Sequence, residues 1–265
     1  MIIGELINSS RKAMRTLIET WDDAAVAEVA KLQADSGADY IDINCGSFTT
    51  DEPKRLAWLA ETVRQSVELP LCIDTPNVEA LKAALPLVGE KQAMINSITA
   101  EKERFASILP LVCEYKTKVI ALCMSDEGIP VGVEGRIKVA DKLIADLTAA
   151  GVKIDDIYID PLVQPLATTN EGALPLLNAV IAINDKYPQV HCVCGLSNIS
   201  FGLPKRKLIN RTFLVQAAFA GIDSFILDPT DKQLMGALFA GEALLGHDPF
   251  CGRYLMQYRK GLFNE

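Results

Sequence analysis

The chain alternates eight short hydrophobic runs with eight longer segments of helical periodicity, and this alternation restricts the fold more than any other feature. The runs are continuously apolar, as expected of parallel strands that are buried on both faces. The expected strands span residues 2–7, 39–44, 70–74, 92–97, 118–123, 157–160, 191–195 and 223–227. The expected helices span residues 22–36, 51–67, 77–86, 101–115, 134–150, 171–186, 208–220 and 231–245.

Eight strand–helix units predict an α/β fold of one particular kind, a single (β/α)8 TIM barrel. The 265 residues match the usual size of such a barrel, about 250 residues. A doubly wound open sheet would also alternate strands and helices, but eight regular units leave nothing over for a second domain. We therefore expect one domain over residues 1–265, with a barrel at 1–248 and a C-terminal tail at 249–265 that packs on it.

The first expected helix shows how the apolar faces are assigned. Within residues 22–36, Ala25, Val29 and Leu32 follow helical spacing and predict the stripe that faces the strands. Gly37 follows as a stop signal at the C-terminal end.

Composition excludes several classes of partner. The net charge of −8 and the lack of a basic stripe argue against a nucleic-acid partner. No apolar run approaches the ~20 residues that span a bilayer. The chain enters an apolar run at Ile2 with no signal peptide before it, so we expect a cytoplasmic protein without membrane contact.

The cysteines and histidines argue against a tightly bound metal. There are seven cysteines, an odd number, and only two histidines. Neither residue type shows the spacing of metal ligands. Most of the cysteines lie in apolar runs and are expected to be small, reduced core residues of a cytosolic protein: Cys72, Cys113, Cys123, Cys192 and Cys194.

Polar side chains stand where several of the expected strands end. Asp74, Asn96, Asp160 and Asn198 each follow an apolar run, and in a barrel these ends share the face that carries the active site. A carboxylate accepts two parallel hydrogen bonds, and an asparagine both donates and accepts. The set therefore suits a neutral, flat heterocycle such as a reduced pterin. Any one of these residues could instead cap the next helix, and Asp74 fits that alternative well.

The strand-end segments resemble the pterin-binding TIM-barrel family that includes dihydropteroate synthase. Within that family they are most similar to the methyltetrahydrofolate:corrinoid methyltransferases. Dihydropteroate synthases have a lysine-containing loop near strand seven and a basic pair for pyrophosphate, whereas this chain reads Gly195-Leu196-Ser197-Asn198 there. The segments that carry the resemblance are Ile3–Asn8, Asp42–Gly46, Ile73–Thr75, Ala93–Ser97, Tyr158–Leu162, Gly195–Ser200 and Leu208–Phe213.

The resemblance implies roles for individual residues. Asn198 matches the asparagine that hydrogen-bonds N5 of the folate, the atom that carries the methyl group, and would be the catalytic residue. Phe201 departs from the pattern, because a polar, glutamine-like contact is expected there. The implied substrate-binding residues are Asp74, Asn96, Asp160, Gly195, Ser197, Asn198 and Arg206.

The implied reaction moves a methyl group between N5 of tetrahydrofolate and the cobalt of a corrinoid. Tetrahydrofolate or 5-methyltetrahydrofolate is then the substrate, and transfer in either direction fits. No Asp-x-His-x-x-Gly motif is present, so a separate corrinoid protein should carry the cobalamin. Two alternatives remain open: a dihydropteroate-synthase-like enzyme, and a noncatalytic folate-binding module.

The expected helix at 231–245 is apolar over more than one stripe, which is more than a barrel helix needs. The tail from Phe250 to Phe263 or a second subunit could cover the surplus. Relatives in the family are generally homodimers, so we expect a two-fold homodimer with this helix near the interface.

Overall fold

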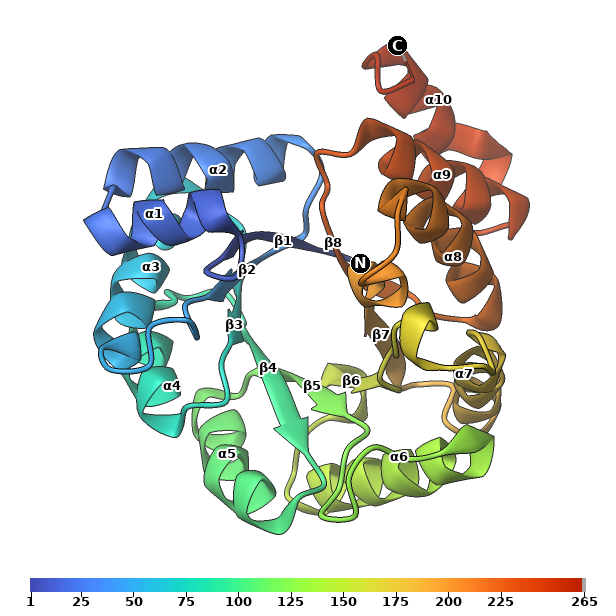
Figure 1. The fold of residues 1–265 in the computed structure, drawn as a ribbon, viewed down its shortest axis with the longest axis horizontal. Coiled ribbons are helices and arrows are strands. Elements are labelled where there is room, and N and C mark those ends of the chain that lie inside the picture. The colour runs from blue at the N-terminus through green and yellow to red at the C-terminus, as the bar shows by residue number, and fades with distance from the viewer. Residues whose placement is uncertain (264–265) are drawn as a thin grey trace.

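Eight parallel strands close into a barrel in the order β1 to β8, and β8 pairs back with β1. The computed structural model describes residues 1–263. The view in Figure 1 looks along the barrel, with the strands around the centre and the helices outside them. The expected fold is confirmed. The strands are β1 Ile2–Asn8, β2 Tyr40–Asn44, β3 Leu71–Asp74, β4 Met94–Thr99, β5 Lys118–Leu122, β6 Ile157–Asp160, β7 His191–Gly195 and β8 Ser224–Leu227.

Each expected helix is present, with ends that move by a few residues. These helices are α2 Asp23–Asp35, α3 Glu52–Ser66, α4 Val78–Ala84, α5 Lys102–Tyr115, α6 Gly132–Ala149, α7 Leu174–Lys186, α8 Arg206–Ala220 and α9 Lys232–Leu244. Two further α-helices were not predicted, namely α1 Lys12–Thr20 and α10 Gly252–Arg259. The ring of Phe263 lies against Gly236 of α9. A Cβ added to Gly236 would be only 3.0 Å from Cε1 of Phe263. Residues 264–265 of the expected tail lie outside the described residues.

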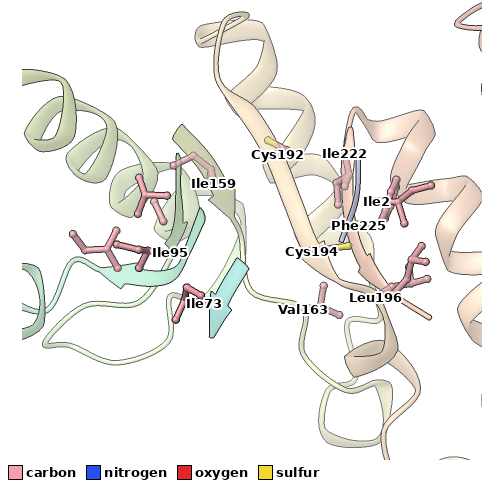
Figure 2. Close-up of a cluster of buried hydrophobic side chains, with 14 of the residues drawn as sticks. Ile2, Ile73, Ile95, Ile159, Val163, Cys192, Cys194, Leu196, Ile222 and Phe225 are labelled. Carbon is pink, nitrogen blue, oxygen red and sulfur yellow. The ribbon is translucent and has the colours of Figure 1, made fainter. Parts of the chain in front are cut away.

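Alternation along the strands sorts the apolar side chains into two layers. The outer layer fills the space between strands and helices and includes Ile73, Ile159 and Phe225, as Figure 2 shows. The inner layer plugs the barrel, so that its interior is a packed core and not a pore. The inner-layer residues are Ile3, Tyr40, Cys72, Met94, Ile120, Tyr158 and Val193.

Two expectations about burial are wrong in detail. In α2 the buried residues are Val26, Ala30 and Gln33, whereas Leu32 is about half exposed. Gln33 is buried and its Oε1 accepts the backbone N–H of Leu6 at 2.9 Å, so the buried stripe lies one residue further along the helix than expected. Cys113 is exposed, unlike the other four cysteines expected in the core.

Candidate functional site

The site forms where the barrel interior changes from apolar to polar. Inner-layer residues recur every second position along a strand, so the residue two places after each also points inward, one layer closer to the C-terminal end. Tyr40 is followed in this way by Asp42, and Tyr158 by Asp160. The same step leads to the other inward positions of this layer, Glu5, Asp74, Asn96, Leu122 and Gly195.

A cavity of about 820 Å³ opens at this layer. Polar side chains from β1, β2, β3, β4, β6 and the loops after β7 and β8 line it. The structure therefore brings every predicted site residue into one cavity: Asp74, Asn96, Asp160, Gly195, Ser197, Asn198 and Arg206.

Asp74 faces the cavity and does not cap the helix that follows it. The cap of α4 is Asn77, whose side chain accepts the backbone N–H groups of Glu79 and Ala80. Asp74 Oδ2 instead accepts a hydrogen bond from Asn44 Nδ2 at 3.0 Å. Burial raises the pKa of Asp74 to about 6, and the Asn44 bond offsets part of that rise. The Asn44 bond orients the Asp74 carboxylate, which can still accept hydrogen bonds from a ligand in the cavity.

Asp42 is a fully buried residue of the same polar layer, on β2 next to the strand that carries Asp74. Asn96 Nδ2 donates to Asp42 Oδ1 at 3.3 Å. Burial raises the pKa of Asp42 well above its usual range, and the nearby Asp74 carboxylate raises it further. Burial and the neighbouring Asp74 carboxylate therefore both favour the protonated form of Asp42.

Asp160 ends β6 at the opposite side of the cavity. Its Oδ1 accepts the backbone N–H of Leu162 at 2.8 Å, within a corner where Leu162 has φ of 65°. The buried Arg136 of α6 fixes this corner by donating from Nε to the Pro161 carbonyl at 2.9 Å. Burial raises the pKa of Asp160 to about 7. Ligand N–H groups that donate to Asp160 would stabilise the ionised form of this buried carboxylate.

The segment after β7 is a tight 3₁₀ turn, Leu196–Ser200, that presents Asn198 to the cavity. A side chain at Gly195 would crowd it, because an added Cβ would lie 3.1 Å from Asn198 Nδ2. Arg206 closes the turn from α8, donating to the Ser197 carbonyl at 2.7 Å and to Ser200 Oγ at 3.0 Å. The Asn198 side chain is exposed and makes no hydrogen bond within residues 1–263, so it is available to a ligand.

Glu5 adds a carboxylate that was not among the predicted site residues. Arg11 donates to its Oε1 at 2.6 Å, and Ser197 Oγ lies 3.4 Å from its Oε2. Burial raises the pKa of Glu5, and the Arg11 charge opposes that rise. Asp42 and Asn44 were also not predicted as site residues. All three lie toward the C-terminal ends of strands, where a barrel carries its active site.

Acidic residues gather in this cavity without the arrangement of a metal site. No group of three or more histidine, cysteine, aspartate or glutamate side chains within residues 1–263 could hold a metal ion. Over the same residues, no helix has the length and hydropathy that a membrane span requires.

A family model described as "Pterin binding enzyme" matches residues 5–228, which include every strand end that lines the cavity. The chain belongs to the pterin binding enzyme family. This confirms the resemblance seen in the strand-end segments.

Named proteins that are similar in sequence to this chain agree with this assignment. A methylcorrinoid:tetrahydrofolate methyltransferase from Eubacterium limosum is 37% identical over 263 residues, which are 98% of this chain and 97% of that protein. Methionine synthase from Mycobacterium tuberculosis is 31% identical over 240 residues, 86% of this chain, and this match spans only 20% of that larger enzyme.

Solved structures of dihydropteroate synthases share the barrel. Dihydropteroate synthase from Xanthomonas albilineans superposes with a TM-score of 0.72 at 23% identity, covering 92% of both chains. The enzyme from Yersinia pestis, in complex with a sulfonamide drug, also gives 0.72 at 16% identity, covering 93% of this chain and 94% of the other. Similarity at this level establishes the fold and says nothing about the reaction.

Proposed function

We propose that this chain is a methyltransferase that moves a methyl group between N5 of tetrahydrofolate and the cobalt of a corrinoid carried by a partner protein. The observation that carries the proposal is the 37% identity, over almost the full length of both chains, to a methylcorrinoid:tetrahydrofolate methyltransferase. The cavity supports it, because the residues expected to hold the pterin all line this one cavity.

The edge of a reduced pterin ring fits three polar side chains deep in this cavity, those of Asp74, Asn96 and Asp160. A reduced pterin presents a ring N–H beside an amino group, and a carboxylate can accept both in parallel. Asp160 is the carboxylate best placed for that role, since the bond from the Leu162 N–H leaves its other oxygen positions for a ligand. Asp74 and Asn96 are neighbours in register on β3 and β4 and would bind the remaining edge.

Asn198 is the residue that would act on N5. Transfer of a methyl group to or from a ring nitrogen changes the charge on that nitrogen, so a hydrogen bond that strengthens as the charge develops lowers the barrier. An exposed asparagine on a turn fixed by Arg206 can hold such a bond without rearrangement. The corrinoid supplies the cobalt chemistry, and the barrel supplies position.

The partner protein must reach N5 from outside, and the C-terminal face of the barrel is where this cavity opens. We propose that the corrinoid protein docks over this face. We also propose a cytoplasmic location, which fits the seven unpaired cysteines.

A homodimer is a further part of the proposal. The apolar groove between α7, α8 and α9 has a volume of about 640 Å³ and carries Leu174, Phe219 and Leu244, which are 66%, 74% and 84% exposed. Exposed apolar surface of this kind marks interaction sites. We propose that residues 1–265 form one domain whose tail covers α9 near Gly236, while a second copy covers the groove.

A spectral assay tests the function. Mixed without oxygen, the protein, tetrahydrofolate and methylcobalamin should give cobalamin(I) and 5-methyltetrahydrofolate. Folate binding without methyl transfer, with free methylcobalamin and with corrinoid proteins, would indicate a noncatalytic module. Formation of a pteroate from a pterin pyrophosphate and 4-aminobenzoate would instead favour the synthase alternative.

A further inference from the structure

Phe201 places a phenyl ring in solvent at the mouth of the cavity. Its side chain is 65% exposed, and it is among the residues that line the cavity. A ring in this position adds little to the buried core, so its contribution to folding is small. It also stands where the family resemblance leads one to expect a polar residue.

The surroundings of Phe201 are fixed by the turn that presents Asn198. The Phe201 N–H donates to the Asn198 carbonyl at 3.1 Å and thereby closes that turn. Arg206 lies beside the ring, with Cζ 5.9 Å from the ring centroid. Arg206 also donates hydrogen bonds to the Ser197 carbonyl and to Ser200 Oγ, and these bonds hold the guanidinium beside the Phe201 ring before a ligand binds.

Tetrahydrofolate carries groups that match this pair. The carbon next to N5 bears the bridge to a second aromatic ring, the aminobenzoyl group, which ends in glutamate carboxylates. If Asn198 faces N5, the bridge leaves the pterin beside the turn that Phe201 closes. Offset or edge-to-face contact between two aromatic rings is favourable, and a carboxylate beside an arginine is favourable as well.

We propose that Phe201 is the surface on which the aminobenzoyl ring of tetrahydrofolate packs, with Arg206 beside the glutamate carboxylates. Phe201 then determines the preference of this enzyme for a complete folate over a bare reduced pterin. The inference rests on the proposed function, since it takes the pterin to lie at Asp74, Asn96 and Asp160.

Two ligands separate the aminobenzoyl contact from the pterin contact. Titration calorimetry would measure the dissociation constants of tetrahydrofolate and of 6-methyltetrahydropterin, which lacks the second ring. Phe201→Ala should weaken tetrahydrofolate about tenfold, or about 1.4 kcal/mol, and leave 6-methyltetrahydropterin within twofold. Phe201→Tyr keeps the ring and should restore most of the tetrahydrofolate affinity.

Leu208→Ala is the matched control. Leu208 is 67% exposed on α8 but does not line the cavity, so its loss should change neither dissociation constant. Equal weakening of both ligands by Phe201→Ala would overturn the inference, because the residue would then shape the pterin site. Unchanged tetrahydrofolate affinity, with or without a raised KM for a corrinoid protein, would overturn it too. If the unaltered protein binds neither ligand, the proposed function itself fails.

Discussion

The backbone N–H of Leu162 donates a 2.8 Å hydrogen bond to Oδ1 of Asp160, within a buried corner of the barrel. The bond favours the ionised carboxylate, yet burial outweighs it and raises the pKa of Asp160 to about 7. A carboxylate balanced in this way near neutral pH is sensitive both to ligands and to small changes of pH.

Folate affinity should therefore depend on pH. Pterin N–H donors favour ionised Asp160, so the complex has a lower pKa at this group than the free protein. Affinity should be constant above about pH 7 and fall as the pH drops below it, by up to about tenfold per unit for one group.

The same carboxylate is expected to bind two donors. Asp160→Asn should therefore weaken the binding of tetrahydrofolate by roughly 2–4 kcal/mol and flatten the pH profile of the affinity near pH 7.

Titration calorimetry between pH 5.5 and 8 measures this profile. Asp74→Asn is the informative comparison: burial raises the pKa of Asp74 only to about 6, so this variant should keep the fall that begins near pH 7. An affinity for the unaltered protein that does not change over this range would contradict the prediction. Unchanged affinity in Asp160→Asn would leave Asp160 as a structural residue of the corner.

The same carboxylate should cost stability when no ligand is bound. An unfolded aspartate has a pKa of about 3.9, and the folded pKa of Asp160 is about 7. The folded state binds the proton more tightly, so this group favours folding below about pH 4, and that contribution is lost as the pH rises to about 7. Asp160→Asn should therefore stabilise the ligand-free protein at pH 8 by roughly 2–4 kcal/mol and have little effect at pH 4.

Urea unfolding at the two pH values checks the sign. The amide oxygen of the variant can still accept the Leu162 N–H, so the corner itself should survive. A variant that is less stable at pH 8 would show that the ionised carboxylate is better solvated than its burial indicates.

Asn198→Ala should separate binding from chemistry. The side chain is exposed, so the fold should not change, and its bond to N5 should matter most in the transition state. The methyl-transfer rate should fall by about 10²–10³, as for loss of one preorganised donor, while tetrahydrofolate affinity falls far less. Stopped-flow spectra of the cobalamin and calorimetry of folate binding give the two quantities.

Gln189→Ala provides the control for this variant. Gln189 is an exposed amide residue between α7 and β7, outside both the cavity and the groove between α7, α8 and α9, and its replacement should leave both the rate and the affinity unchanged. Equal losses of rate and affinity in Asn198→Ala would make Asn198 a binding residue only.

Periodicity predicted the fold and the strand-end residues Asp74, Asn96, Asp160 and Asn198, whereas Gly195, Ser197 and Arg206 were expected only from the family resemblance. Continuous apolar runs give buried strands, and a barrel places every strand end on one face, so Asp74 and Asp160 could be found from position alone. The exposure of Leu32 could not be predicted, because the buried face of α2 is set by tertiary contacts, which include the bond from Leu6 to Gln33. The support that Asn44 gives Asp74 likewise depends on how β2 and β3 are paired.

The contact between Gly4 and Gln33 predicts a sensitive position in β1. A Cβ at Gly4 would lie 2.5 Å from Gln33 Oε1, the atom that accepts the Leu6 N–H. Gly4→Ala should lower the free energy of unfolding by about 1–3 kcal/mol, since Gln33 must move within a packed layer. At Gly46 the nearest atom to an added Cβ is 3.7 Å away, so Gly46→Ala should stay within about 0.5 kcal/mol in the same urea experiment. Equal stability of the two variants would show that α2 can shift freely away from β1.

The apolar groove between α7, α8 and α9 leads to the prediction about assembly. Leu244 is 84% exposed there, and a charge at this position would be buried without a partner if a second copy covers the groove. Sedimentation at micromolar concentration should show a dimer for the unaltered protein and a monomer for Leu244→Glu. Val131→Glu alters a residue that is 83% exposed just before α6, outside the groove, and should leave the dimer intact. Monomeric mass for the unaltered protein would rule out the homodimer, and a dimer that persists in Leu244→Glu would place the interface elsewhere than in this groove.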